Sequence, residues 1–156
     1  MHPNAELINR FYDAFNARDA ETMASSYRDD ATFSDPAFGR LTANEVRAMW
    51  RMLLGRAASD LRAEFGAVRA DDETGSAHWE AYYVFEGHPV HNVIDATFEF
   101  RDGLISRHTD DFDWPTWARQ ALGLPGRLFG RTSFLHDKAR ASARRQLDGY
   151  LAQHPS

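Results

Sequence analysis

The chain has 156 residues, of which 43% are hydrophobic and 26% charged, and its formal net charge is −5 at pH 7. This balance is typical of one globular domain with a single core, and it excludes a disordered or fibrous chain. The sequence contains no cysteine, which excludes disulfides, thiolate metal sites and a cysteine nucleophile.

Charge is distributed unevenly along the chain. Residues 1–113 carry 11 Lys and Arg against 21 Asp and Glu, whereas residues 114–156 carry 7 against 2. We expect no nucleic-acid partner for so acidic a body, and a basic tail that complements the acidic body of this or a neighbouring subunit. No leader pattern begins the sequence and no apolar run reaches the about 18 residues of a membrane span, so we expect a cytoplasmic protein without a membrane partner.

Helical spacing of apolar residues dominates the beginning of the chain. It predicts a helix over residues 4–17, with Asn4 able to cap its first turn. A second, short helix is expected from Asp19, a capping residue type, to about Tyr27. A short extended piece over residues 31–34 follows it.

A capping box introduces a third helix, because Glu45 follows Thr42 by three residues. This helix is expected to end at Gly55. After it the apolar period changes to two, which indicates strands. Four strands are expected, over residues 61–70, 76–86, 90–101 and 104–113.

Turn residues and alternation define the expected sheet. Asp102-Gly103 is a strong hairpin signal between the last two strands. Helices followed by strands that return on one another predict an α+β fold rather than a βαβ fold. Trp79, Tyr83 and their neighbours form an aromatic face that we expect to meet the helices. The opposite face is mixed, and we expect a homodimer to form through it.

Two helices are expected beyond the strands. Trp114-Pro115 begins a short helix with Pro at its first position, which extends to Leu122. A longer helix is expected from Ser133 to about Ala152, and it is rich in basic residues.

Two stretches of the sequence resemble a known superfamily. Residues 8–36, INRFYDAFNARD followed by YRDDATFSDP, resemble the opening of ketosteroid isomerases and SnoaL-like polyketide cyclases of the nuclear transport factor 2-like superfamily. The resemblance continues through FEFRDG at 98–103. It implies a cone-shaped, curved antiparallel sheet wrapped around three N-terminal helices, with an internal pocket. Residues 1–113 would form this cone domain, and residues 114–156 a helical extension packed on the same domain.

The Asp-Pro pair within this resemblance gives the first candidate catalytic residue. In ketosteroid isomerases the matching aspartate moves a proton next to a carbonyl, which implies this role for Asp35. A carboxylate beside an apolar cavity has a raised pKa, closer to a useful catalytic range. The plainer interpretation is a turn residue before Pro36.

Two departures argue against that particular isomerisation. The family's tyrosine matches Phe11 and its protonated aspartate matches Ala96, and neither side chain can donate a hydrogen bond. Tyr12 is one residue away and points about 100° away on an ideal helix.

The last strand is similar to a different group of enzymes. Residues 107–113, RHTDDFD, are similar to the Trp-Arg-Asp-Tyr-Phe-Asp type of motif in limonene epoxide hydrolases, whose first aspartate activates water. Asp110 matches it and shares a strand face with His108. The Arg-x-Asp that completes the site in those enzymes is missing. The plainer interpretation is a satisfied core histidine and a strand-end aspartate, while Asp111 and Asp113 are expected to be structural.

The combined hypothesis is a cofactor-independent acid–base enzyme of the isomerase, cyclase or hydrolase type. Asp35 and Asp110 would carry protons and His108 would orient or share them, on a small hydrophobic carbonyl or epoxide. No metal or cofactor is expected, because no metal-ligand spacing, phosphate loop or Gly-x-Ser-x-Gly nucleophile is present. The expected aromatic pocket lining is Phe11, Phe15, Tyr27, Phe33, Trp50, Trp79, Tyr83, Phe98 and Phe112. The alternative is a non-catalytic ligand-binding or dimerisation module of the same fold.

Overall fold

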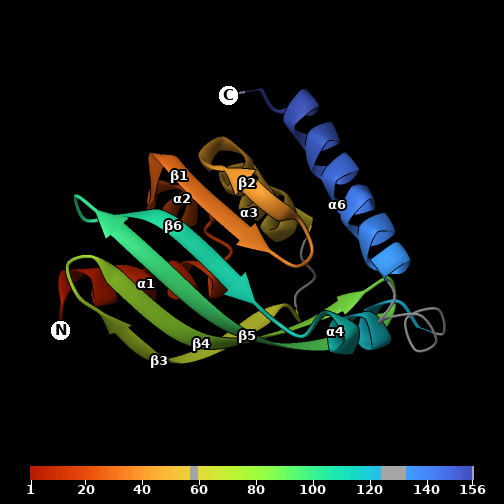
Figure 1. Ribbon diagram of the computed structural model, residues 1–156, viewed down its shortest axis with the longest axis horizontal. Helices are drawn as coiled ribbons and strands as arrows, with labels where there is room; N and C mark the ends of the chain where they lie inside the picture. Colours follow the sequence, from red (N-terminus) through yellow and green to blue (C-terminus); the bar gives the residue numbers. More distant parts are fainter. Residues whose placement is uncertain (57–59, 124–132, 156) are drawn as a thin grey trace.

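The computed structural model describes residues 1–56, 60–123 and 133–155. Three helices and two strands come first (Figure 1): α1 (Pro3–Asn16), α2 (Ala20–Ser25), β1 (Tyr27–Asp35), β2 (Gly39–Thr42) and α3 (Ala43–Arg56). Four strands and two helices follow: β3 (Arg62–Ala70), β4 (Thr74–Phe85), β5 (His88–Arg101), β6 (Leu104–Asp111), α4 (Trp114–Ala121) and α6 (Ser133–Gln153).

The strands form one curved, unclosed sheet in the order β2-β1-β6-β5-β4-β3. Helix α1 contacts β3 and β4, and α3 contacts β1 and β2, so the N-terminal helices pack on the sheet. The predicted α+β fold, a curved sheet around three N-terminal helices with further helices after it, is confirmed. One pairing adds to that prediction, because β1 runs parallel to β6 while the other neighbours are antiparallel.

Local signals place most helix starts correctly. Asp19 accepts a hydrogen bond from the Thr22 amide at the start of α2, and the Thr42–Glu45 capping box forms in both directions. The predicted cap of α1 is wrong: His2 accepts from the backbone amide of Asn4 instead. The Asn4 side chain is buried and donates to the backbone carbonyls of the β3–β4 turn, because that turn lies against the helix start.

The strand predictions agree with the structure to within a few residues at each end. Arg101 pairs with Leu104 across a two-residue turn in which Asp102 and Gly103 have φ values of 54° and 77°, as the hairpin signal requires. Strand β1 is longer than the expected extended piece, because α2 ends at Ser25 and Tyr27 already belongs to the strand. Strand β2 was not predicted, since only four residues form it.

Alternation along β5 separates the two faces of the sheet as expected. The side chains at 94, 96, 98 and 100 are buried, and those at 93, 95, 97 and 99 are exposed. The buried face, with Trp79 and Ala81 of β4, packs into the hydrophobic core.

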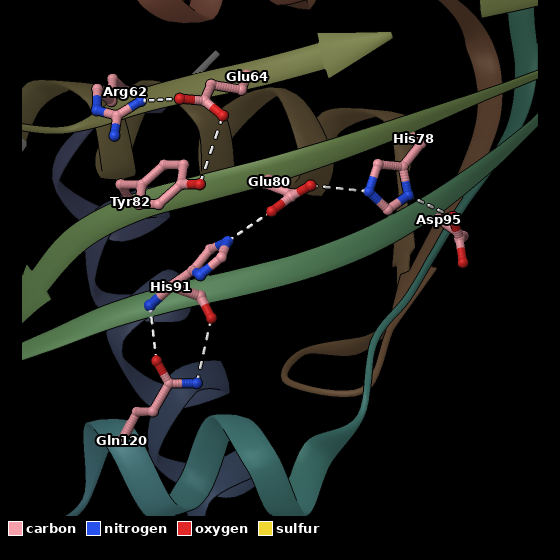
Figure 2. Close-up of polar contacts among 8 residues, drawn as sticks. All are labelled: Arg62, Glu64, His78, Glu80, Tyr82, His91, Asp95 and Gln120. Atoms are coloured by element: carbon pink, nitrogen blue, oxygen red, sulfur yellow. Dashed lines mark hydrogen bonds and ion pairs between the residues drawn. The ribbon is translucent and has the colours of Figure 1, made fainter. Parts of the chain in front are cut away.

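The outer face carries two groups of polar contacts, shown in Figure 2, which are joined by the Tyr82 ring stacked on that of His91 at 4.3 Å. Glu80 accepts from His91 at 2.6 Å and interacts with His78 at 3.1 Å, and His78 also contacts Asp95 at 2.9 Å. We call this set the outer-face network: Arg62, Glu64, His78, Glu80, Tyr82, His91, Asp95 and Gln120. The homodimer expected through this face stays a prediction.

The C-terminal helices pack on the rest of the chain. Asp113 caps α4 by accepting from the Thr116 amide at 3.2 Å, which confirms its expected structural role. Helix α6 contacts α3, with Leu147 fully buried. Arg144 of α6 pairs with Glu45, so the basic tail does contact an acidic residue of its own chain. The division at residue 113 stays a prediction.

The described part of the chain contains no helix that is both long enough and apolar enough to pass through a membrane.

Candidate acid–base site

The parallel pairing of β1 with β6 brings two carboxylates together. Ser34 of β1 pairs with Thr109 of β6, so the next positions along the two strands are Asp35 and Asp110. Neighbouring strands lie about 4.8 Å apart, and residues at paired positions share a face. The charge of Asp110 contributes to the pKa of Asp35, as expected for close neighbours. The structure therefore brings together the two residues that the sequence assigned as proton carriers.

A chain of buried hydrogen bonds leads to Asp110 from the core. The indole Nε1 of Trp50 donates to the Tyr27 hydroxyl oxygen at 3.0 Å, and that hydroxyl lies 2.8 Å from Nδ1 of His108. Nε2 of His108 lies 2.8 Å from Oδ1 of Asp110. Since the Tyr27 oxygen accepts from Trp50, its own proton can go to Nδ1, which leaves a neutral His108 to donate from Nε2. Every member of the chain then has a partner.

His108 is closed off from any ligand by aromatic rings. Its side chain is 0% exposed, and the ring centroids of Phe98, Phe33 and Phe11 lie 4.4, 5.0 and 5.7 Å from its own. Both ring nitrogens are already engaged, so His108 has no free position for a substrate. The geometry fits the orienting half of its predicted role, in which it fixes the carboxylate of Asp110.

Asp110 is held at one of its two oxygens. Oδ1 receives His108 and, at a longer 3.4 Å, the indole Nε1 of Trp79. Within the described residues, no hydrogen bond ends on Oδ2, which leaves that oxygen available for a substrate proton. Ala96 lies opposite Asp110 on β5.

Asp35 combines a turn role with an unusual pKa. Its Oδ1 accepts from the Phe38 amide at 2.6 Å, so Asp35 does stabilise a turn, as the plainer interpretation predicts. Burial raises the pKa of Asp35 to about 7, and the charge of Asp110 adds to this effect. The amides of Phe38 and Ala37 and the charge of Arg140 act in the opposite direction. Near neutral pH Asp35 therefore exists in both protonation states, as an acid–base catalyst requires.

Tyr12 is a site residue that the sequence reasoning set aside. It is 0% exposed, and within the described residues its hydroxyl has no hydrogen-bond partner. Burial, together with the charge of Asp110, holds its pKa well above the ordinary value, so the hydroxyl stays protonated beside the site. The sequence did contain a signal, because Tyr12 follows Ile8 by four residues and precedes Phe15 by three, inside the apolar stripe of α1.

The expected aromatic lining divides into two groups. Seven rings are buried in the core: Phe11, Phe15, Tyr27, Phe33, Trp50, Trp79 and Phe98. Tyr83 and Phe112 are only partly buried. The Tyr83 hydroxyl accepts from Nε1 of Trp117 at 2.6 Å, and burial raises the pKa of Tyr83 to about 12, with Asp35 contributing. Tyr83 thus lies near Asp35, while the deeper rings fill the narrow end of the fold.

Two hollows on the described residues lie away from the two carboxylates. One of about 400 Å³ is formed by β4, β5 and α4, with Tyr82, Tyr83 and Gln120 among its lining residues. Another of about 350 Å³ surrounds the β3–β4 turn. Neither is lined by Asp35 or Asp110, so the internal pocket stays a prediction. Within the described residues, no three His, Asp or Glu side chains are grouped so that they could hold a metal ion.

Residues 8–108 match the model of the SnoaL-like domain family. The chain belongs to the SnoaL-like family. This places it in the nuclear transport factor 2-like superfamily and confirms the resemblance found in the sequence. None of the curated proteins matches the sequence.

Solved structures share the fold at low sequence identity. Bal32a, from a soil-derived mobile gene cassette, is 22% identical with a TM-score of 0.67, over 76% of this SnoaL-like chain and 96% of its own. An LEH-like epoxide hydrolase from M. tuberculosis is 19% identical with a TM-score of 0.63, over 85% and 95%. A ketosteroid isomerase-like protein from Catenulispora acidiphila, in complex with trimethylamine, is 14% identical with a TM-score of 0.66, over 78% and 95%. At these identities the similarity shows the fold alone.

Proposed function

We propose that the protein is a cofactor-independent acid–base enzyme acting on a small hydrophobic molecule. The observation that carries this proposal is the register of β1 and β6, which sets Asp35 beside Asp110 on the inner face of the sheet. The similarity to an epoxide hydrolase structure supports a hydrolase or isomerase type of reaction. Cytoplasmic location and a homodimer through the outer-face network are proposed with it.

The surroundings of the two carboxylates divide their roles. Asp110 receives two N–H donors on Oδ1, so we assign it as the base that takes a proton from water or from carbon through Oδ2. Asp35, with its pKa near 7, returns a proton to the oxygen of the opening epoxide or enolate. The Tyr12 hydroxyl, which has no partner among the described residues, can donate to the same substrate and so supply a hydrogen bond that Phe11 and Ala96 cannot.

The test is turnover of a probe panel that separates the reaction types. Styrene oxide reports epoxide hydration, and cyclohex-3-enone reports proton transfer next to a carbonyl. We expect turnover of at least one probe, with a pH profile that bends near 7 because of Asp35. Asp110→Asn and Asp35→Asn should each lower kcat/KM about 100-fold or more, the usual contribution of a positioned acid or base.

Asp111→Asn is the matched control, because Asp111 adjoins Asp110 in the chain but is exposed on the opposite face. It should leave kcat/KM unchanged. Wild-type turnover that survives in both Asp35→Asn and Asp110→Asn would contradict the proposal, and so would a wild-type protein that turns over neither probe.

One observation favours the second candidate, a binding module without catalysis. The rings around His108 pack edge to face or stacked against it, so the narrow end of the fold is filled by side chains. If the protein is a binding module, a variant with both Asp35 and Asp110 replaced should bind the probes as tightly as wild type does. Turnover of either probe would exclude this candidate.

A further inference from the structure

Helices α4 and α6 place donor groups over the turn that holds Asp35. Nε2 of His136 lies 2.6 Å from the backbone carbonyl oxygen of Pro36, and Nη2 of Arg140 donates to the same oxygen at 3.1 Å. These contacts fix one face of α6 next to the candidate site. The residues lie beyond position 108, where the match to the SnoaL-like family ends. The matched part of the chain therefore contributes the turn to this region, but not the donors on α4 and α6.

Two buried donors in this region have no acceptor. Trp114 is 7% exposed, and its indole Nε1 has no hydrogen-bond partner among residues 1–56, 60–123 and 133–155. The same holds for Nε of Arg140. Both atoms can only donate. A buried donor without a partner destabilises the fold, so two of them in one place call for an acceptor that the described residues do not supply.

His136 connects the two donors. Its ring stacks on Trp114 with centroids 4.2 Å apart, and its Nε2 lies 3.3 Å from Nη2 of Arg140. The Arg140 side chain lies beside Gly39 of the same turn, since a Cβ at that position would make an ordinary contact of 3.5 Å with Arg140 Nε. We call Trp114, His136 and Arg140 the C-terminal subsite.

The C-terminal subsite carries positive charge that is not neutralised by an ion pair. Within the described residues Arg140 makes no salt bridge, whereas Arg144, one turn along α6, pairs with Glu45 and Asp148. The charge of Arg140 acts on Asp35, whose pKa is raised to about 7 and which can therefore be neutral near pH 7. An anionic oxygen placed here would meet N–H donors and a cation.

We propose that the C-terminal subsite binds a carboxylate of the substrate, so that the substrate class is a hydrophobic carboxylic acid. The inference deepens the proposed acid–base function and rests on it for the substrate's reaction. Trp114 Nε1 and the guanidinium of Arg140 donate to the carboxylate oxygens, and the apolar body extends toward Tyr83 and Asp110. Binding by these groups would position the reacting atoms between Asp35 and Asp110.

The experiment compares two probes of the same shape and different charge, 2-naphthoate and 2-naphthamide. Binding is followed by titration and by the indole N–H signals of the four tryptophans in ¹⁵N NMR spectra, with the Trp114 signal assigned from Trp114→Phe. We expect naphthoate to bind at least about 10-fold more tightly than naphthamide and to shift the Trp114 signal. Arg140→Met should lower naphthoate affinity about 10-fold or more and leave naphthamide unchanged.

Two matched variants separate the subsite from general effects on α4 and α6. Arg145→Met removes an exposed cation from the same helix and should leave naphthoate affinity unchanged. Trp117→Phe removes an indole N–H that already has a partner, the Tyr83 hydroxyl, and should lower stability more than Trp114→Phe does.

The inference is overturned if naphthoate does not bind, if it binds without moving the Trp114 signal, or if Arg140→Met and Arg145→Met weaken it equally. These outcomes are independent of turnover. Naphthoate binding with the expected variant effects, but without turnover of the reaction panel, would keep the subsite and reject the acid–base function. Turnover of the reaction panel without a preference for naphthoate over naphthamide would keep the acid–base function and reject the subsite.

Discussion

The two faces of the sheet carry similar hydrogen-bonded pairs in opposite environments. On the inner face His108 bonds to Asp110, and their side chains are 0% and 5% exposed. On the outer face His78 bonds to Glu80, and their side chains are 42% and 29% exposed (Figure 2). Both are pairs two residues apart on one strand, so the local geometry is the same and burial is the main difference.

Burial decides what each pair can do. Water screens the outer pair, and exposed pairs of this kind contribute about 0–1 kcal/mol to stability. Aromatic rings exclude water from the inner pair, so removal of one partner leaves a buried polar group unpaired. The inner pair is therefore rigid enough to hold the candidate carboxylate of Asp110 in place, whereas the outer pair remains free to respond to solvent.

The largest expected effect comes from removing the histidine on each face. His108→Leu leaves the Tyr27 hydroxyl without its acceptor and Asp110 without its nearest donor, and we expect the free energy of unfolding to fall by about 3 kcal/mol. His78→Leu should lower it by less than about 1 kcal/mol. Urea unfolding of both variants measures the comparison, and equal losses would show that burial does not separate the two faces.

A second prediction concerns the pH dependence of stability. The pKa of Asp35 is about 7 in the folded protein and near 3.8 in the unfolded chain, so the folded state binds the proton more tightly. Stability should therefore fall as pH rises from about 4 to about 7 and stay lower above that. Asp35→Asn should remove this fall and be more stable than wild type near pH 8, by up to about 4 kcal/mol.

Asp111→Asn is the control for this pH series. Its exposed carboxylate lies on the outer face, and the slope of stability against pH should be that of wild type. An Asp35→Asn protein that keeps the wild-type slope would show that Asp35 is not the group responsible.

Two buried tyrosines of the core, Tyr12 and Tyr27, should differ by a smaller amount in their contribution to stability. Tyr27→Phe removes a hydroxyl that serves both Trp50 and His108, and should cost about 1–2 kcal/mol. Tyr12→Phe removes a hydroxyl with no partner in the described part of the chain, and should change stability by no more than about 0.5 kcal/mol or increase it. A larger loss for Tyr12→Phe in thermal unfolding would mean that its hydroxyl is engaged in the folded protein.

The smallest expected effect is the pH response of the outer-face network. Hydrogen bonds to Asp95 and then to Glu80 raise the pKa of His78, so its contribution is present below pH about 6.5 and is lost as pH rises through the raised value. Solvent screening should keep this contribution below about 0.5 kcal/mol. His78→Gln should flatten the response, and high salt should weaken it in wild type. A response that salt does not change would indicate that a partner surface covers this face.

Much of the fold could be predicted because its signals are local. The Thr42–Glu45 box and the Asp102-Gly103 turn act within four residues, so propensity and capping fix them wherever the segment lies. The alternation in β5 likewise needs only the period of a strand with one buried face. The candidate carboxylates were also found, through the resemblance of short motifs to known families.

The remaining features depend on contacts between distant segments. His2 caps α1, whereas the Asn4 side chain donates to the backbone of a turn 67 residues away. The rules for helix capping do not include such a distant contact. Ideal helix geometry predicts that Tyr12 points away from Phe11, whereas α1 buries a stripe wide enough for both residues.

The sequence by itself determined the order of the helices and of all strands except β2. It also determined the buried face of the sheet and the identity of the two candidate carboxylates. Only the tertiary structure decided that β1 runs parallel to β6 and sets Asp35 beside Asp110, that His108 is enclosed, and that Arg140 lies over the Asp35 turn near Trp114 and His136. The physical reason is the distance along the chain over which each interaction acts. Propensity, capping and alternation act over a few residues, whereas strand register and the pairing of buried donors are set by the packing of the whole chain.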